Sequence, residues 1–419
     1  MCIRAIFTIA LTYGACLFSP YTLLAQTEIE QAKVPYVLTI SDLRSADLSP
    51  DETRLAVVLS HITGDPHRPR HSYEVQVWDF RKGTMVVRKL LGSRIAAPGV
   101  GFSAIRYTSD GRLLVVYAAG TTIFVLQPDD LEKIRSVDIE LPPPSRSAQR
   151  MAVGYEDLET RVTSFETSPN GHLVALRLYR GTGLERWGLF WKNAYLGGYA
   201  GVYDLDSGIK INQWEISKGY LAGGSGLAWQ SNGKHLAVAS SDAVPCMRGG
   251  GTVYLLDPAS SGIMRQFRVS NLVGDIAWGD EDYIYVANGS CPGYFSNQAP
   301  VLPVYSASTG KQIGAFKSPT GIRVRTAVSP DRRRLIAYVG RDKMTFRGLE
   351  DTLVGVDSKF EVLDLRTGQI MFTSPELGSP SGWPSLAPTL RLSTRGDLAM
   401  VFTSTGGVRI FPICYSGHH

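Results

Sequence analysis

Residues that could bind a metal ion are concentrated around position 65 of the chain. Three of the seven histidines fall within eleven residues there, beside one carboxylate. Imidazole and carboxylate groups are ligands of zinc and copper, so one interpretation is a metal site. The alternative is a solvated polar loop, because Arg68 and Arg70 lie in the same segment and no helix or strand fixes the ligand spacing. The candidate ligands are His61, Asp65, His67 and His71.

A second segment combines large aromatic residues with arginines, and it could bind a partner. Aromatic and arginine side chains dominate binding hot spots, and aromatic rings also stack on sugars. The alternative is a hairpin that packs its rings against the body of the protein as a local core, because large aromatic residues are usually buried. The candidate binding residues are Arg180, Arg186, Trp187, Phe190, Trp191, Tyr195 and Tyr199.

Sequence motifs of common catalytic sites are missing from the chain. It has no Gly-x-Ser-x-Gly nucleophile motif, no His-Glu-x-x-His zinc motif and no phosphate-binding loop. We therefore predict no catalytic residues and no cofactor.

One local pattern recurs seven times: a tight polar turn followed by a short apolar strand. In the first copy, Ser49-Pro50-Asp51 leads into Leu55-Ala56-Val57. A second strand follows each copy and commonly ends in a Thr-Gly or Ser-Gly turn, as at Thr367-Gly368. Glycine suits such turns because the backbone there reaches positive φ. Each unit is predicted to form four antiparallel strands, which make one blade of a β-propeller.

The two ends of the repeat array predict how the ring closes. The last unit has strands near residues 390–392, 398–402 and 408–413, and residues 37–40 form a strand outside any unit. This N-terminal strand can complete the last blade and so remove exposed sheet edges. The predicted fold is all-β, a seven-bladed β-propeller that occupies residues 26–419 as a single domain.

The repeats resemble the WD40-like and YVTN-like propeller repeats of bacterial exported proteins. The resemblance rests on the Ser-Pro-Asp turns, the following Leu-Ala-Val strands, and strands such as Val362-Leu363-Asp364 before Thr-Gly, and it covers most of residues 35–414. The Gly-His pair of WD40 repeats is missing, and only Trp78-Asp79 spells the name dipeptide. The resemblance implies a propeller fold. It implies no activity, because propellers host unrelated functions.

Long connections between the second and third strands are predicted on one face in blades 1, 3, 4, 5 and 6. Loops commonly carry binding function, although neutral insertion is the alternative. We predict an interaction platform that uses this face. The alternative function is a propeller enzyme, a lactonase-like hydrolase or a cofactor-bearing oxidoreductase, with its site at the centre of the ring. Cys246 and Cys291 lie in corresponding long loops of adjacent blades, so we predict a disulfide between them.

The first 25 residues are predicted to be a secretory signal peptide. Arg4 is their only charged residue, residues 5–18 are uncharged, and Pro20 and Ala25 fit a cleavage region. An uncleaved membrane anchor and lipidation at Cys16 are the alternatives. The signal peptide implies a secreted or periplasmic location.

Charge and composition restrict the class of partner. Because Arg4 is the only charged residue among the first 25, their removal lowers the formal net charge from +5 to +4. Such a small excess gives no basis for nucleic-acid binding. We expect a monomer with no membrane span in the mature chain. The expected partner is a protein or polymer in the cell envelope or outside the cell.

Overall fold

The computed structural model divides into two units, Met1–Pro35 and Tyr36–His419, and the strands that the structure describes lie in the second. The first unit, with the predicted signal peptide, lies outside the described residues. In the described ranges every regular element is a strand, and none contains a helix suited to crossing a membrane. The structure describes residues 36–40, 42–64, 70–95, 104–116, 121–140, 158–182, 185–187, 190–192, 195–217, 226–241, 250–269, 273–280, 282–288, 301–317, 322–347, 350–375, 377, 389–403 and 407–413.

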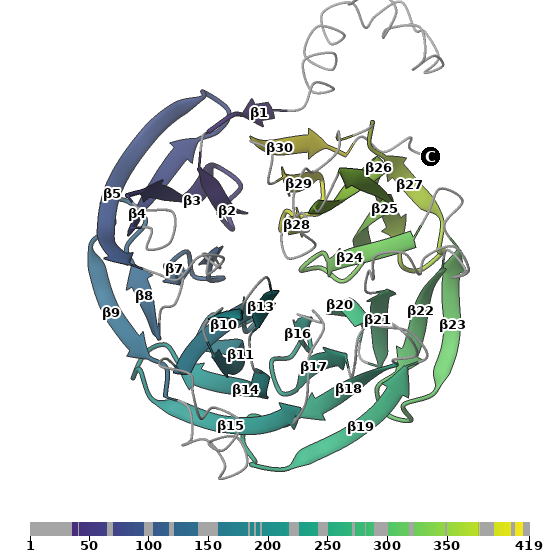
Figure 1. Cartoon of the computed structure of the whole chain (residues 1–419). Coiled ribbons are helices and arrows are strands. Elements are labelled where there is room, and N and C mark those ends of the chain that lie inside the picture. The colour runs from purple at the N-terminus through teal and green to yellow at the C-terminus, as the bar shows by residue number, and fades with distance from the viewer. Residues whose placement is uncertain are drawn as a thin grey trace, which may run out of the picture. The chain divides into compact units, whose positions relative to one another are not determined.

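Seven four-stranded antiparallel sheets form the blades of a propeller, with the first strand of each blade innermost and the fourth outermost (Figure 1). The predicted all-β, seven-bladed fold is therefore confirmed. The first four blades are β2 (Leu43–Leu48), β3 (Arg54–Thr63), β4 (Arg70–Asp79) and β5 (Thr84–Ile95); β6 (Ala104–Tyr107), β7 (Leu113–Val116), β8 (Thr122–Leu126) and β9 (Lys133–Asp138); β10 (Leu158–Thr167), β11 (Leu173–Thr182), β14 (Tyr195–Asp204) and β15 (Lys210–Ser217); β16 (Leu227–Trp229), β17 (Leu236–Ser241), β18 (Gly251–Leu256) and β19 (Ile263–Val269).

The last three blades complete the ring, and one small extra sheet lies between two strands of blade 3. The blades are β20 (Val273–Trp278), β21 (Tyr283–Asn288), β22 (Val301–Ser306) and β23 (Gln312–Lys317); β24 (Ile322–Val328), β25 (Arg334–Arg347), β26 (Glu350–Asp364) and β27 (Ile370–Thr373); β28 (Thr389–Leu392), β29 (Leu398–Thr403), β30 (Gly407–Pro412) and β1 (Tyr36–Leu38). The extra sheet pairs β12 (Glu185–Trp187) with β13 (Phe190–Lys192).

The N-terminal strand closes the ring, as the sequence predicted. In blade 7, β1 pairs with β30, with Val37 opposite Arg409. The ring of Tyr36 meets that of Phe80 in blade 1 edge to face, with centroids 5.4 Å apart. Blade 7 is therefore built from both ends of the repeat array and is joined to blade 1 by the same strand.

The recurring serine of the turns stabilises the hairpin that follows it. Its hydroxyl oxygen accepts the backbone N–H five residues later, at 2.9 Å from Ser49 to Arg54 and at 3.0 Å from Ser393 to Leu398. A short side chain that satisfies turn N–H groups is what a tight polar turn requires. The repeated phrase is therefore scaffold.

Seven separate hydrophobic clusters hold the ring together, and each is shared by two neighbouring blades. The cluster of blades 1 and 7, for example, joins Leu55 and Val57 to Met400 and Ile410. Since each blade buries its apolar faces only against its neighbours, stability depends on a closed set of junctions.

Two turn glycines provide a test of how tightly one blade packs against the next. Gly83 and Gly368 both end a turn between third and fourth strands, with φ of +66° and +72°. An added Cβ would meet nothing within 4 Å at Gly83, but at Gly368 it would lie 2.8 Å from the Phe316 ring of blade 5. We expect Gly83→Ala to cost about 1 kcal/mol for its left-handed backbone. Gly368→Ala should cost about 1–2 kcal/mol more because Phe316 must shift. Urea unfolding measures both, and equal losses would contradict this account.

Candidate functional site

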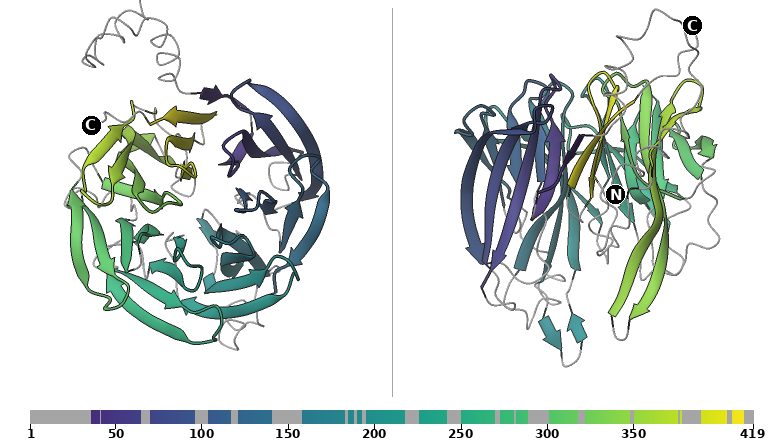
Figure 2. Two further views of the ribbon diagram at one scale, coloured as in Figure 1. Left: turned by 180° about the vertical axis from the view of Figure 1, so that it is seen from behind. Right: turned by 90° about the horizontal axis from the view of Figure 1, so that it is seen from above.

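Two connections between second and third strands extend as β-hairpins beyond the other strands on one face of the ring (Figure 2). In blade 3, β12 and β13 pair with Arg186 opposite Trp191 and Trp187 opposite Phe190. In blade 6, β25 and β26 continue past a register shift near Val339 and pair out to Arg347 opposite Glu350. Where the sequence predicted long loops, these two blades carry ordered backbone pairing, so we call this side the hairpin face.

The predicted aromatic and arginine residues are distributed between this hairpin and the blade that supports it. Arg180 lies on β11, the next four lie on β12 and β13, and Tyr195 and Tyr199 lie on β14. Tyr199 is only 6% exposed and belongs to the core shared by blades 2 and 3, so it supports the hairpin from within. The side chains of the other six lie outside the described residues, and their role in binding stays a prediction.

Two of the four predicted metal ligands, His61 and His71, do not lie together in the structure. On β3 and β4, Ile62 is the register partner of His71, and His61 is that of Ser72. His61 and His71 therefore lie on opposite faces of the blade. His61 Nδ1 is 2.7 Å from a carboxylate oxygen of Asp42, whereas His71 Nδ1 is 3.2 Å from the Ser60 hydroxyl.

The rest of the metal prediction concerns residues outside the described ranges. Asp65 and His67 are among these residues, so the four-ligand site stays a prediction. Among the residues that the structure describes, no group of three or more histidine, cysteine or acidic side chains could hold a metal ion. The predicted disulfide between Cys246 and Cys291 also falls on residues outside the described part of the chain.

Burial of His71 makes it a source of pH-dependent stability. Desolvation, and secondly the charge of Arg44, lowers the pKa of the His71 imidazole. The unfolded chain then binds the proton more readily, so stability should fall as pH drops below about 6.5. We expect His71→Gln to weaken this fall. Urea unfolding at pH 8 and pH 5 measures it: the pH 8 loss reports packing, and an unchanged pH dependence would contradict the assignment.

Four charged side chains from innermost strands meet at the centre of the ring. These residues, Asp47, Arg106, Glu166 and Arg391, are called the central cluster, and they come from blades 1, 2, 3 and 7. Arg391 Nη2 donates to Glu166 Oε2 at 3.0 Å, although the two blades are separated by two others on one side and three on the other. Arg391 Nε lies 3.7 Å from Asp47 Oδ1, and Arg106 Nε lies 3.9 Å from Glu166 Oε2. The cluster therefore links four blades across the axis.

Side chains of the inner strands, and one from a turn, also cap the free edges of the inner strands. Asp47 Oδ2 accepts the N–H of Tyr107 in the next blade at 2.8 Å. Asp275 in blade 5 accepts the N–H of Thr326 in blade 6 in the same way, at 3.4 Å. The carbonyl of Trp229 accepts from Arg332 Nη2 at 3.3 Å. Because the innermost strand has no fifth strand beside it, these bonds supply partners that the sheet itself lacks.

Burial disfavours the charged forms of the central cluster residues, and the ion pairs between them offset this effect. Desolvation raises the pKa of Asp47, although Arg106 and Arg391 oppose the shift. Desolvation and the like charge of Arg391 lower the pKa of Arg106 to about 10. Burial also disfavours charged Arg391, but Glu166, Asp47 and Asp275 together outweigh it and raise that pKa. Both carboxylates of the cluster are thus engaged by arginines, which is the arrangement of a structural network.

The sequence contained a signal for the central cluster, at the position two residues before the first residue of each turn. These first residues are Ser49, Thr108, Ser168, Gln230, Gly279, Ser329 and Ser393. This position is charged in blades 1, 2, 3 and 7, and it is alanine in blades 4, 5 and 6. Read along one unit, a single charge beside a turn looks like solvated surface. The four charges are recognised as one group only when the seven units are aligned and this position is known to face the axis. The alanines at that position are Ala228, Ala277 and Ala327.

Comparison with known proteins shows the fold. No family model matches the chain, and a search of curated proteins finds no match. A chain in the crystal structure of the mitotic checkpoint complex is similar with a TM-score of 0.52 and 16% identity, over 92% of this chain and 93% of that chain. In total, 997 solved chains match this chain. So broad a similarity identifies the fold but no particular function. It supports a seven-bladed WD40-like propeller and leaves membership in the exported bacterial family a prediction.

Proposed function

We propose that this protein is an exported interaction platform that binds a protein or polymer partner through its hairpin face. The observation that carries the proposal is the pair of β-hairpins projecting from one side of the ring, β12–β13 and the outer half of β25–β26. Backbone pairing gives each hairpin a preferred shape before binding, which lowers the entropy lost on association. Trp187, Phe190 and Trp191 give the blade 3 hairpin the residue types of a hot spot.

Export is part of the same proposal, and it rests on the N-terminal sequence. Residues 5–18 are uncharged and follow a single arginine, as in a secretory signal peptide. The proposed location is the periplasm or the exterior of the cell, and the proposed state is a monomer. The partner is expected in the same compartment.

The arrangement of the central cluster favours this function over the enzyme alternative. A carboxylate can act as a general acid or base only if it is free to give a proton to a substrate or take one from it. Asp47 accepts a backbone N–H and faces Arg391, and Glu166 accepts from Arg391. These contacts commit both groups to holding the ring.

Replacement of the blade 3 hairpin tests the proposal. Residues 182–194 are exchanged for Asn-Gly, which closes β11 onto β14 at the Gly181–Tyr195 pair and leaves the blade intact. We expect the variant to fold normally and to lose at least about tenfold in partner affinity, because the hot-spot residues are gone. Affinity capture from the envelope and culture medium of the exporting cell, followed by titration of the captured partner, measures the loss.

A companion variant shortens the other hairpin of the same face. Exchanging residues 345–352 for Asn-Gly closes β25 onto β26 at the Met344–Leu353 pair. If both hairpins contribute, each variant binds more weakly than the wild type. Identical partners and affinities for all three proteins would show that the hairpins do not bind the partner. Recovery of the protein only from the cytoplasm would contradict export.

A further inference from the structure

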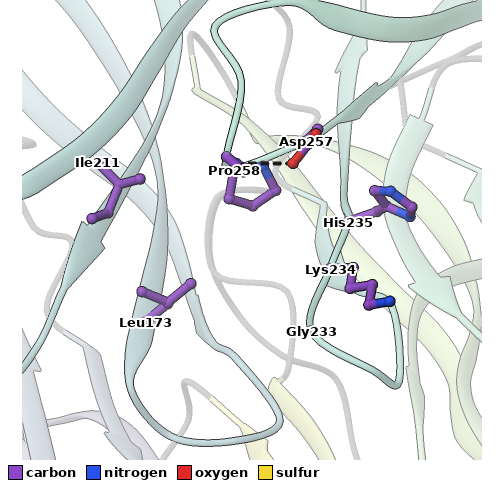
Figure 3. A pocket seen from close by; sticks show the side chains of 8 residues that line it. Leu173, Ile211, Gly233, Lys234, His235, Asp257 and Pro258 are labelled. Carbon is purple, nitrogen blue, oxygen red and sulfur yellow. Dashed lines mark hydrogen bonds between the residues drawn. The ribbon is translucent and has the colours of Figure 1, made fainter.

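A groove of about 470 Å³ opens between blades 3 and 4, at the end of the ring where the tight turns lie. Figure 3 shows Leu173 and Ile211 of blade 3 on one side and Pro258 on the other, with Lys234 and His235 beyond it. Its volume falls in the range of small-ligand and peptide-anchor pockets. The groove lies opposite the hairpin face, because turns between first and second strands and turns between second and third strands emerge at opposite ends of a blade.

At the groove, an ion pair found at two other blade junctions is replaced by two uncharged, apolar residues. At the junction of blades 1 and 2, Arg54 pairs with Asp129. At the junction of blades 2 and 3, Arg112 Nη1 pairs with Asp206 at 2.7 Å. Strand register places Leu173 at the arginine position and Ala259 at the aspartate position of the junction between blades 3 and 4. Neither side chain can bridge the gap, so the junction stays open and apolar.

A proline removes a backbone contact within blade 4, on the side that lines the groove. In blades 3 and 6 the residue after the third strand donates its N–H to the turn before the second strand, Leu205 to His172 at 2.8 Å and Leu365 to Arg333 at 2.9 Å. The residue at this position in blade 4 is Pro258, which has no N–H. The carbonyl of Lys234 therefore lacks the bond that the carbonyl of His172 receives. The groove thus presents an apolar wall next to a backbone acceptor.

We propose that this groove binds an extended segment of a partner protein that carries an aliphatic residue next to an aspartate or glutamate. The aliphatic side chain lies between Leu173, Ile211 and Pro258. A backbone N–H of the segment donates to the carbonyl of Lys234. The inference is independent of the proposed function, because it concerns the opposite face of the ring.

Charge at the groove selects an acidic residue beside the anchor. Asp257 Oδ1 already accepts the N–H of Ala259 at 2.8 Å, so this carboxylate serves its own turn. His235 Nδ1 is 2.7 Å from Gln230 Oε1. Among the lining charges, half-buried Asp257 is negative, and exposed Lys234 provides an ammonium that a ligand can reach. A carboxylate on the segment would complement it.

Peptide display tests the proposal on the full-length folded protein. A library of random peptides of about 12 residues, long enough for an extended segment, is selected on the wild type. Selection is repeated on the double variant Leu173→Arg/Ala259→Asp, which introduces the ion pair found at the other two junctions. Thermal unfolding checks that this variant is folded, because Leu173 packs against the core shared by blades 3 and 4. Ile211→Arg is a second blocking variant that adds charge at an exposed position, and Ile134→Arg, the corresponding position of blade 2, is its control.

The expected peptides carry Ile, Leu or Val beside Asp or Glu. They should bind both blocking variants at least about tenfold more weakly than the wild type and the Ile134→Arg control, because the anchor site is filled. Lys234→Glu should remove the acidic preference. Peptides that bind all variants equally, or no enrichment on the wild type, would overturn the proposal. Self-association that the double variant abolishes would assign the groove to a second copy of this chain instead.

Discussion

A variant that begins at residue 42, and so lacks β1, is expected to lose most of its folding stability and to aggregate. Removing β1 exposes the edge of β30 and uncovers Val408 and Ile410, which are buried in the junction of blades 1 and 7. It also removes Tyr36, Leu38 and Ile40, which pack against the same cluster. Partial burial of three such side chains contributes roughly 3–5 kcal/mol, against a total stability of about 5–15 kcal/mol. An unpaired β30 is in addition a template for association between molecules.

A variant that begins at residue 34 provides the control, because it removes the same N-terminal unit but keeps β1. Thermal unfolding and sedimentation of both proteins separate the closing strand from the segment before it. The longer variant should unfold cooperatively and remain monomeric, whereas the shorter one should unfold at a markedly lower temperature. Two proteins of equal stability would mean that direct contacts between blades 1 and 7 are sufficient. Those contacts include Arg395 Nη2 bonded to Glu52 Oε2 at 3.0 Å.

Much of the scaffold could be predicted from the sequence because each of its features is local and repeated. A serine-capped turn, an apolar strand and a glycine turn identify one blade, and seven copies identify the ring. The closing strand could also be predicted, since residues 37–40 had no blade of their own. The extended strands of blade 6 were not predicted. Residues 341–347 and 350–356 alternate too irregularly to be recognised, and register across the hairpin pairs them.

The central cluster and the groove could not be predicted from single units, because both are properties of several blades together. Glu166 and Arg391 lie 225 residues apart in the chain and meet only when the ring has closed. Leu173 is unremarkable as an apolar residue at the start of a strand. Its significance appears when Arg54 and Arg112 are found at the same register position. In a repeat protein, the informative residue is the one that departs from its counterparts at a junction.

Removing one charge from the central cluster is expected to destabilise the protein more than removing any exposed ion-pair partner. Glu166→Gln leaves Arg391 and Arg106 near each other, with the carboxylates of Asp47 and Asp275 to compensate them. Loss of one partner from a buried pair costs about 3–5 kcal/mol, and the 31% exposure of the Glu166 side chain reduces this to about 2–3 kcal/mol. Asp129→Asn, which removes an exposed partner of Arg54, should cost less than about 1 kcal/mol. Urea unfolding at pH 7 compares them.

A double-mutant cycle with Arg391→Gln shows whether the loss comes from the pair itself. Arg391→Gln should also destabilise, because it leaves Asp47 buried with one fewer positive charge. If the two side chains act as a pair across the axis, the double variant is less destabilised than the sum of the single variants, by about 1–3 kcal/mol. Strict additivity would mean that each group acts through its own blade. The closing of the ring would then depend on the seven apolar junctions alone, and the charges at its centre would serve only to cap strand edges.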